Sequence, residues 1–370
     1  MTHPRFEALH SSAEQVPSGN RSAREQAHVF VVGPGVFGRA LAMCALQAGS
    51  FVTILGLNEE SLSEARAAFA EKQDVSFLTM NPESLAAVQG IKVDLIILAV
   101  PCQALRSVSQ WCRDVLWPVL AASCTQGTHK IPVLCAAKGI ELQTLKLPHE
   151  ILSEFLPDTA GWGILSGPSF AKELQAGLPT AIVVASQQEL VRRTAERLLH
   201  RPHFRVYGTD DVVGVELGGA LKNVIAVVAG VVDGLQLGHN ARAAVVTRGL
   251  GEMAQMGAAL GARPMTFLGL SGLGDLILTC TGDLSRNRRF GLTVAQHPDR
   301  PVSESLADIG QTVEGYSTAK SAKLLSEKLK LDTPILDMAY EVLYENRPVR
   351  AAVEHLLNRG QKGEFDWIGE

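Results

Sequence analysis

The stretch HVFVVGPGVFG, at residues 28–38, decides the fold of this chain. Its first five residues favour β-structure, and they run directly into a turn with glycines at positions 33, 35 and 38. Residues 39–48 then have a helical pattern that ends at Gly49. The stretch therefore predicts a strand, a glycine turn and a helix in immediate succession.

The three glycines have the spacing that the pyrophosphate of a dinucleotide needs. Gly33 permits the tight turn, Gly35 lets the backbone approach the phosphates, and Gly38 allows the helix to pack closely on the strand. A second β-rich run, residues 51–55, follows at the distance that completes a βαβ unit. We therefore predict a dinucleotide-binding site with its phosphates at the N-terminus of the helix.

Further apolar runs continue the alternation of strands and helices. Apolar strands separated by helices predict a parallel sheet that is covered on both faces. Strand patterns stop near residue 209, and helical patterns with glycine-marked breaks follow. The predicted fold is an α/β Rossmann-type doubly wound domain at residues 28–208, followed by an all-α domain at residues 209–360. The expected later strands are residues 93–100, 133–138, 164–166, 181–185 and 204–207.

Composition limits the classes of function. The 370 residues suit two domains, and 46% hydrophobic residues are ample for two buried cores. The net charge of −4 gives no broad basic surface for nucleic acid. The six cysteines show no CxxC spacing, which favours reduced thiols and a cytoplasmic location. His200 and His203 flank Pro202 without other ligand types nearby, so we expect a surface turn and no metal site.

The ends of the chain are polar. Residues 1–27 lack the apolar core of a signal peptide and are expected to form a disordered tail, and residues 361–370 are expected to form a second polar tail. The longest apolar segment is interrupted by Lys222 and Asp233, so it falls short of the roughly 18 uncharged residues that span a bilayer. We expect a protein that is not integral to a membrane.

Lys222 is the most unusual residue of the chain. It lies in LGGALKNVIAVVAGVVDGLQLGHNAR, residues 217–242, a segment that otherwise suits a protein core. A buried ammonium needs a paired charge or a lowered pKa, and either condition suits a proton donor. The alternative is a helical lysine that extends its ammonium into solvent.

Four other places carry more polar groups than packing requires. Lys138 follows a strand, at the edge where open α/β sheets bind ligands, although an ordinary strand-end lysine would look the same. Ser169 either caps a helix or contacts a ligand. Asp275, in a glycine-rich turn, is either an N-cap or the partner of a cation. The run at residues 285–289, SRNRR, is either an anion site or a solvated basic turn.

Five motifs together resemble bacterial NAD(P)-dependent glycerol-3-phosphate dehydrogenase. The resemblance runs in register from about His28 to Asn358, and it implies a Rossmann domain followed by a helical domain, with the helix that carries Lys222 at their junction. It also implies an oxidoreductase that interconverts sn-glycerol 3-phosphate and dihydroxyacetone phosphate with NAD or NADP and supplies glycerol phosphate for phospholipid synthesis. The motifs are SGPSFAKEL (166–174), LGGALKNVIAV (217–227), GLGDLILTCT (272–281), SRNRRFG (285–291) and GQTVEGY (310–316).

The same resemblance implies roles for individual residues. Lys222 matches the catalytic lysine of the family. Leu57 stands where many members carry a basic residue, which argues against a strong preference for NADP. The residues that match substrate contacts are Lys138, Gly167, Ser169, Lys222, Asp275, Ser285, Arg286 and Asn287. The residues expected at the cofactor are Gly33, Gly35, Val36, Phe37, Gly38, Leu57, Lys138, Ala171, Arg286, Thr312 and Glu314.

Two other functions remain open at the level of sequence. One is a related two-domain hydroxyacid dehydrogenase of the 6-phosphogluconate or ketopantoate type. The other is a redox-sensing module that binds a dinucleotide without turnover, since a family fold does not by itself establish catalysis. The expected partners are the two small-molecule substrates, with no nucleic acid, and a homodimer is compatible with the resemblance.

Overall fold

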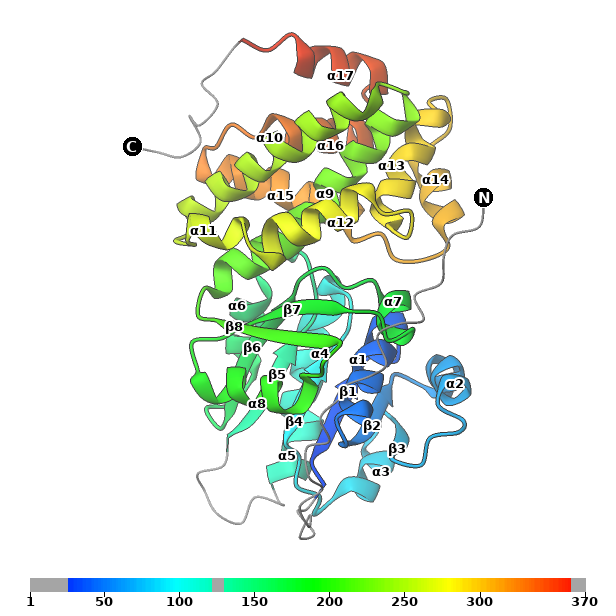
Figure 1. Ribbon diagram of the computed structural model, residues 1–370, viewed down its shortest axis with the longest axis vertical. Coiled ribbons are helices and arrows are strands. Elements are labelled where there is room, and N and C mark those ends of the chain that lie inside the picture. The colour runs from blue at the N-terminus through cyan, green and yellow to red at the C-terminus, as the bar shows by residue number, and fades with distance from the viewer. Residues whose placement is uncertain (1–25, 122–129, 361–370) are drawn as a thin grey trace, which may run out of the picture.

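The computed structural model describes residues 26–121 and 130–360. The predicted N-terminal tail, apart from its last two residues, and the predicted C-terminal tail lie outside this part of the chain. A sheet domain occupies one end of the molecule and a bundle of helices the other (Figure 1).

The sheet has eight strands in the order β3-β2-β1-β4-β5-β6-β7-β8. The first six follow the strand order of a Rossmann fold, and β7 and β8 extend one edge. The strands are β1 (His28–Val32), β2 (Phe51–Gly56), β3 (Val75–Thr79), β4 (Leu95–Leu98), β5 (Ile131–Cys135), β6 (Ala160–Ser166), β7 (Thr180–Ala185) and β8 (Phe204–Thr209).

The sheet differs from the prediction at two strands. It is mixed, because β7 runs antiparallel to β6 while its other neighbour, β8, is parallel to it. The connection from β6 to β7 holds only the five-residue helix α7 (Ala171–Gln175). A helix of that length spans about 7 Å, so this connection lacks the long crossover helix that usually joins parallel strands. Strand β3 was missed because its run, VSFLT, is short and mostly half-buried.

Helices cover both faces of the sheet, as the apolar strands predict. Alternate residues of β1 enter two different cores, with Val29 and Val31 on one side and Phe30 and Val32 on the other. Helices α1 and α8 bury their apolar residues in the first core, and α4 and α6 do so in the second. The helices of this domain are α1 (Val36–Gln47), α2 (Glu59–Ala68), α3 (Pro82–Leu85), α4 (Leu105–Trp111), α5 (Trp117–Ala121), α6 (Pro148–Phe155), α7 and α8 (Glu189–Leu199).

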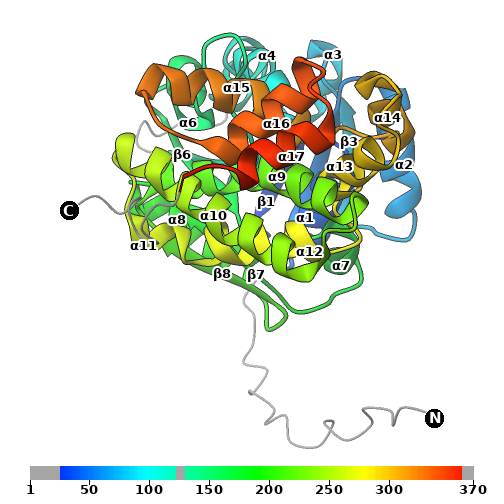
Figure 2. The ribbon, with the colours of Figure 1, turned by 90° about the horizontal axis from the view of Figure 1, so that it is seen from above.

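The second half of the chain is helical and is built around α9 (Val212–Gly234). Helix α9 is long and apolar enough to cross a membrane, yet 94% of its most apolar window is buried inside the protein. The surrounding helices enclose it from several sides (Figures 1 and 2). Helix α9 packs against α10 (Gly238–Ala259), α11 (Pro264–Phe267), α12 (Asp275–Thr281), α13 (Arg286–Gln296), α15 (Glu314–Leu329) and α16 (Pro334–Tyr344), whereas α14 (Val302–Ile309) packs against α13 and α17 (Val349–Leu357) against α16.

The first turns of α9 are fastened to both halves. The side chain of Asp211 caps the helix by accepting a hydrogen bond from Gly214 N at 3.1 Å, and it also accepts one from Arg263 N at 2.9 Å. In the next turn, the buried carboxylate of Glu216 accepts the backbone N–H of His149 at 2.7 Å and pairs with its ring at 2.6 Å. His149 belongs to α6, so the start of α9 is held against the sheet domain.

A buried carboxylate also fixes the start of α16. Glu252 of α10 accepts hydrogen bonds from Ile335 N at 2.8 Å and Leu336 N at 3.1 Å. Burial raises the pKa of Glu252 to about 8, although the two backbone hydrogen bonds act to lower it. The side chain thus satisfies two N–H groups that the first turn of a helix leaves without a partner.

Replacing Glu252 by alanine should therefore destabilise the fold. We expect Glu252→Ala to lower the free energy of unfolding by about 2 kcal/mol, because a buried donor that loses its acceptor costs roughly 1 to 3 kcal/mol. Urea denaturation measures the change. The control is Glu304→Ala, which removes an exposed i,i+4 partner of Arg300 and should cost less than about 0.5 kcal/mol. Equal losses in the two variants would contradict the role given to Glu252.

Candidate active site

Three charged side chains from distant parts of the chain meet at the junction of the two domains. Asp275 is the first residue of α12, Lys222 lies on α9, and Lys138 lies just beyond β5. One carboxylate oxygen of Asp275 lies 2.7 Å from Lys138 Nζ, and its other oxygen forms an ion pair with Lys222 Nζ. The sequence left Asp275 as either an N-cap or the partner of a cation. In the structure it is a cation partner, and it pairs with two lysines.

Burial and neighbouring charges shift the pKa values of Lys222 and Asp275. Only 6% of Lys222 is exposed, so this lysine does not extend into solvent. Burial lowers the pKa of Lys222 to about 7; Asp275 opposes this shift and the charge of Lys138 adds to it. Burial raises the pKa of Asp275, but the two lysines outweigh burial and hold this pKa below its usual value. Lys222 can therefore give or take a proton near neutral pH.

The glycines before Lys222 make this meeting possible. A Cβ atom at Gly218 would lie 2.4 Å from the carbonyl oxygen of Ser271, in the helical turn η4 (Leu270–Gly274) that leads into Asp275. A Cβ atom at Gly219 would lie 2.8 Å from Ser166 Oγ and 3.5 Å from Lys138 Cγ. Gly218 is required, because the backbone of η4 approaches α9 more closely than a side chain allows, and a side chain at Gly219 would displace the Ser166 hydroxyl.

Thr279 is a member of this site that the sequence reasoning missed. Its hydroxyl accepts a hydrogen bond from Lys222 Nζ at 3.1 Å and donates one to the backbone oxygen of Asp275 at 2.6 Å. The signal was available, since residues four apart on a helix share a face. Thr279 therefore orients the lysine from the same helix that carries its counterion.

The carbonyl oxygen of Gly167 is a second anchor for Lys138. This oxygen accepts hydrogen bonds from Lys138 Nζ at 3.3 Å and from Ser169 Oγ at 2.9 Å. Gly167 has a φ of +123°, which a side chain would strain. Helix α7 has Phe170 as its N-cap and no side-chain cap, so Ser169 does not cap it. Gly167 and Ser169 thus lie beside Lys138, and their contact with substrate stays a prediction.

The SRNRR run divides between structural and site positions. Ser285 caps α13 by accepting the N–H of Arg288 at 3.2 Å. Arg288 pairs with Asp233 at 2.7 Å and Asp283 at 3.0 Å, so it does not join an anion site with its neighbours. Arg286, in contrast, interacts electrostatically with Glu314 of α15.

Asn287 ties three helices together. Its amide nitrogen donates to Asn223 Oδ1 at 2.9 Å, and its amide oxygen accepts the N–H of Gly315 at 2.9 Å. Asn223 directly follows Lys222 on α9, and Gly315 is the second residue of α15. Asn287 therefore fixes the position of α13 beside Lys222. A contact with substrate would use the second N–H or the second oxygen lone pair of its amide.

Arg286 of α13 and Glu314 of α15 interact electrostatically. Burial raises the pKa of Glu314 to about 7, while the charge of Arg286 and a hydrogen bond from the backbone N–H of Cys102 lower it. Burial lowers the pKa of Arg286, and Glu314 opposes that shift. Arg286 keeps exposed surface and stays charged at neutral pH. Because Cys102 lies just after β4, Glu314 joins the helical domain to the carboxyl edge of the sheet.

The glycine turn fits the pyrophosphate of a dinucleotide. Gly33 has a φ of +108°, and a Cβ atom at Gly38 would lie 1.9 Å from the carbonyl oxygen of Gly33. Helix α1 starts at Val36 with no side-chain cap and no acidic residue in its first turn, so its N–H groups face no competing acceptor from these positions. Phe37 and Ala171 pack against the same core as α1, beside this turn.

Comparisons with known proteins agree with this geometry. Residues 28–191 match the model described as the NAD-dependent glycerol-3-phosphate dehydrogenase N-terminus, and residues 211–354 match the corresponding C-terminus. The chain belongs to the glycerol-3-phosphate dehydrogenase family. Membership makes it an oxidoreductase with NAD(P)-dependent glycerol-3-phosphate dehydrogenase activity, which confirms the resemblance seen in the sequence.

Individual relatives cover almost the whole chain. A glycerol-3-phosphate dehydrogenase [NAD(P)+] of Nitrosomonas europaea is 40% identical over 92% of this chain and 100% of its own length. One from Geobacter metallireducens is 41% identical over 91% of this chain and 98% of its own. The crystal structure of glycerol-3-phosphate dehydrogenase from Coxiella burnetii has a TM-score of 0.80 and 32% identity, covering 90% of this chain and 99% of that one.

The end of β2 bears on the choice between NAD and NADP. Leu57 is 75% exposed and uncharged. The side chain of Asn58 caps α2 by accepting the N–H of Ser61 at 2.9 Å, and Glu59 pairs with Arg66 at 3.1 Å. A free carboxylate here would favour the ribose hydroxyl of NAD, and a free cation would favour the 2′-phosphate of NADP. Among Leu57, Asn58, Glu59 and Arg66 there is neither a free carboxylate nor a free cation.

We therefore expect weak discrimination between the two cofactors. The values of kcat/KM for NADH and NADPH, at fixed dihydroxyacetone phosphate, should differ by less than about a hundredfold, which corresponds to roughly 2.7 kcal/mol. Leu57→Arg should shift the ratio about tenfold or more toward NADPH, because it adds a charge-assisted partner for the phosphate. Leu57→Met is the control and should leave the ratio unchanged. A wild-type preference beyond a hundredfold would refute this expectation.

Proposed function

We propose that the chain reduces dihydroxyacetone phosphate to sn-glycerol 3-phosphate, with Lys222 as the catalytic proton donor. The observation that carries this assignment is the pairing of one buried carboxylate, Asp275, with Lys222 and Lys138. In this arrangement Lys222 has a pKa near neutrality while a charged neighbour holds its ammonium in place. A proton donor poised near the working pH is efficient in both directions of a reversible reaction.

The proton transfer follows from these contacts. Bound NAD(P)H would supply the hydride that reaches the carbonyl carbon of the substrate. As charge develops on the carbonyl oxygen, the ammonium of Lys222 stabilises it and gives it a proton, which leaves a neutral lysine and an alcohol. Asp275 and Thr279 hold the ammonium in place, and Lys138 contributes a second positive charge. The reverse reaction begins with neutral Lys222 as the base.

The phosphate of the substrate would be held at a distance from the reacting carbon. We assign this role to Arg286, with Ser285 and Asn287 beside it on α13. A guanidinium forms paired, charge-assisted hydrogen bonds to a phosphate, which fixes orientation as well as affinity. The raised pKa of Glu314, about 7, supports this assignment, because a carboxyl that is partly protonated near neutral pH repels the phosphate less than a fully ionised one.

The cofactor contacts inferred from the family complete the assignment. The glycine turn would hold the pyrophosphate, with Val36 and Phe37 at the start of α1 and Ala171 at the start of α7 nearby. Thr312 and Glu314 would approach from the helical domain. A boundary at about residue 209 is proposed between the cofactor-binding domain (28–208) and the substrate-binding domain (209–360), because β8 ends and α9 begins there.

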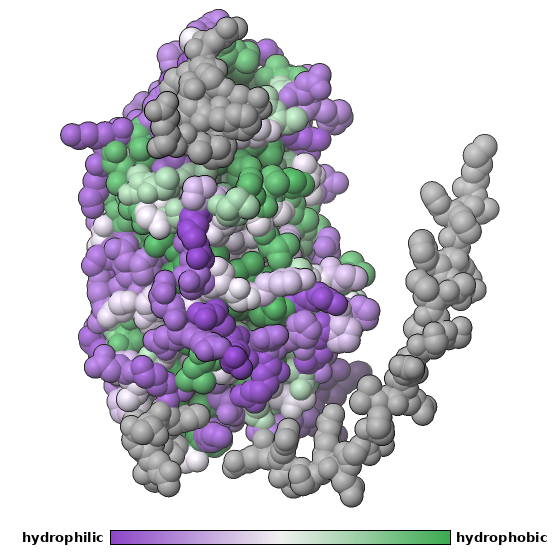
Figure 3. Space-filling view, turned by 60° about the vertical axis from the view of Figure 1, so that its left-hand side comes forward, coloured by the Kyte–Doolittle hydropathy of each residue, from purple (hydrophilic) through white to green (hydrophobic). Residues whose placement is uncertain are grey.

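The wider role is also part of the proposal. The enzyme would supply glycerol phosphate for phospholipid synthesis in the cytoplasm, as the family does, and would act as a homodimer. Support for the dimer comes from exposed apolar side chains in the helical half, among them Leu237, Met265 and Leu357. Figure 3 shows apolar surface gathered over this half, and large exposed apolar patches mark interaction sites.

Removing the ammonium of Lys222 should abolish most of the activity. We expect Lys222→Met to lower kcat about a hundredfold or more, the size typical of losing a general acid, while the Kd for NADH changes little. In the wild type, kcat/KM for reduction should fall as the pH rises through about 7, because the protonated lysine is lost, and kcat/KM for oxidation should rise. Lys328→Met, at an exposed position of α15, is the control. A folded Lys222→Met enzyme with near-normal kcat would remove Lys222 from the mechanism.

Arg286 should act on the phosphate and not on the carbonyl. We expect Arg286→Ala to raise the KM for dihydroxyacetone phosphate about ten- to hundredfold, since a charge-assisted hydrogen bond contributes roughly 1.5 to 3 kcal/mol. Turnover of unphosphorylated dihydroxyacetone should change much less. Arg300→Ala, which alters an exposed ion-pair cluster on α14, is the control. Equal losses with both substrates would show that the phosphate assignment is wrong.

A further inference from the structure

Lys138 belongs to an irregular connection, yet its ammonium must stay close to Asp275. The connection runs from the end of β5 to the start of α6, residues 136–147. Gly139 has a φ of +155°, and a Cβ atom there would lie 2.9 Å from Cys102 Cβ. The backbone beside Lys138 is therefore pressed against the short helix η2 (Cys102–Ala104), which follows β4.

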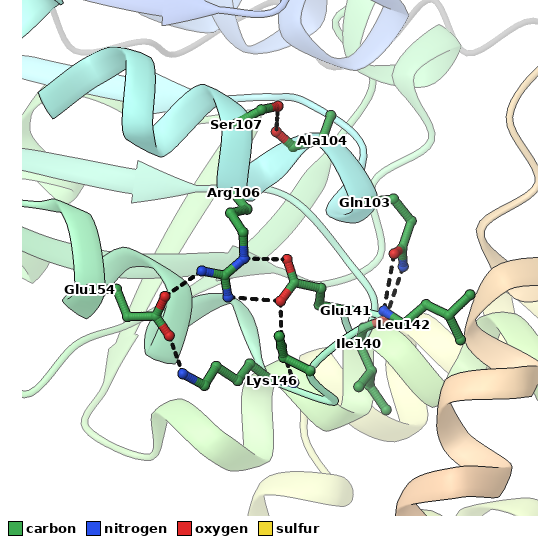
Figure 4. A network of polar contacts seen from close by, with 10 residues as sticks. Gln103, Ala104, Arg106, Ser107, Ile140, Glu141, Leu142, Lys146 and Glu154 are labelled. Atoms are coloured by element: carbon green, nitrogen blue, oxygen red, sulfur yellow. Dashed lines mark hydrogen bonds and ion pairs between the residues drawn. The ribbon is translucent and has the colours of Figure 1, made fainter. Parts of the chain in front are cut away.

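Gln103 of η2 binds this connection in the manner of a neighbouring strand. Its amide nitrogen donates to the carbonyl oxygen of Ile140 at 2.9 Å, and its amide oxygen accepts the N–H of Leu142 at 3.1 Å. Figure 4 shows the Gln103 amide facing both groups. The carbonyl of Ile140 also accepts a hydrogen bond from Ser321 Oγ of α15 at 3.0 Å. The connection is thus held from both domains.

Arg106 binds Glu141, the residue between Ile140 and Leu142. Its Nε and terminal nitrogen lie 2.8 Å from the two carboxylate oxygens of Glu141, a bidentate pair that Figure 4 shows edge to edge. Only 4% of Glu141 is exposed, and the hydrogen bonds from Arg106 hold its pKa below the usual value although burial opposes this. The other terminal nitrogen of Arg106 pairs with Glu154 of α6. A buried carboxylate with a bidentate partner has little freedom to move.

We propose that Gln103, Arg106 and Glu141 are positioning residues that hold Lys138 in register with Asp275, an inference that rests on the proposed role of Lys138 in the site. None of the three is placed at the substrate. Glu141 is three residues from Lys138, so a shift of Glu141 is transmitted through Gly139 and Ile140 to the lysine. A displacement of about 1 Å from a productive geometry can cost a hundredfold in rate.

A displaced Lys138 would have a second consequence. Its charge lowers the pKa of Lys222 in the intact site. When Lys138 moves away from the carboxylate of Asp275, this repulsion weakens, and Asp275 pairs with Lys222 alone. The pH at which reduction loses its general acid should then rise. A residue that only stabilises the fold would lower the melting temperature without moving this pH.

The first test compares Glu141→Gln with Glu154→Gln. Both changes remove one carboxylate partner of Arg106. Glu141 lies within the connection, three residues from Lys138, whereas Glu154 lies on α6 and contacts the connection only near its far end, through an ion pair with Lys146. We expect Glu141→Gln to lower kcat/KM for dihydroxyacetone phosphate ten- to hundredfold and to move the descending limb of its pH profile to higher pH. Glu154→Gln should leave both unchanged. Equal kinetics for the two folded variants, or an unmoved pH limb in Glu141→Gln, would overturn the proposal.

A second test uses Gln103→Ala, which carries no charge change and serves if Glu141→Gln does not fold. It should also lower kcat/KM and raise the same pH limb. Combined with Lys138→Ala, neither Gln103→Ala nor Glu141→Gln should reduce activity further, because residues that act through one lysine are not additive. Full additivity would overturn the proposal.

The same cycle separates this inference from the proposed function. An unimpaired Lys138→Ala enzyme would remove Lys138 from the site, and with it the basis of the inference. An impaired Lys138→Ala enzyme together with unimpaired Gln103→Ala and Glu141→Gln variants would overturn only the positioning role, and the proposed reaction would stand.

Discussion

The structure depends on one buried carboxylate that two lysines share. Burying a single ammonium would be costly, and burying two without an anion would be more so. Asp275 offsets both, and the three groups together carry a net charge of +1 when both lysines are protonated. A site with that charge, largely closed to water, suits a substrate that brings a phosphate. The same three charges come from the sheet domain, the central helix and α12, so the site forms only when the two domains are docked.

Helix α9 combines two roles that usually conflict. It is the central element of the helical core, with apolar residues on all sides, and it also carries the lysine of the site. The conflict is resolved along its length. The part of the helix around Gly218 and Gly219 permits close approach of the sheet domain and of η4, whereas residues 224–232 are apolar and pack against the other helices. Stability and chemistry thus occupy successive parts of one helix.

The two domains meet through contacts at the carboxyl edge of the sheet. Glu216 binds His149, Ser321 binds the carbonyl of Ile140, and Glu314 receives the N–H of Cys102. Each contact joins a helix of the helical domain to a part of the sheet domain: to the start of α6, to the connection after β5, or to the residues after β4. Open α/β sheets bind ligands at this edge. The contacts that join the domains therefore lie at the same edge of the sheet as Lys138.

The sequence alone determined the parts that depend on local pattern. The β1 strand, the glycine turn and the following helix are encoded in consecutive residues, and Lys222 is conspicuous because an apolar segment should not contain it.

Tertiary structure decided which groups meet. Lys138 and Asp275 are 137 residues apart, and nothing in their neighbours indicates that one carboxylate serves both lysines. From the sequence, Arg288 could belong to an anion site, but in the structure it forms ion pairs with Asp233 and Asp283. The antiparallel β7 likewise follows from how little helix joins it to β6. Periodicity and spacing report what a segment forms, whereas the partner of a charged side chain depends on how distant segments pack, and that is fixed only when the chain is folded.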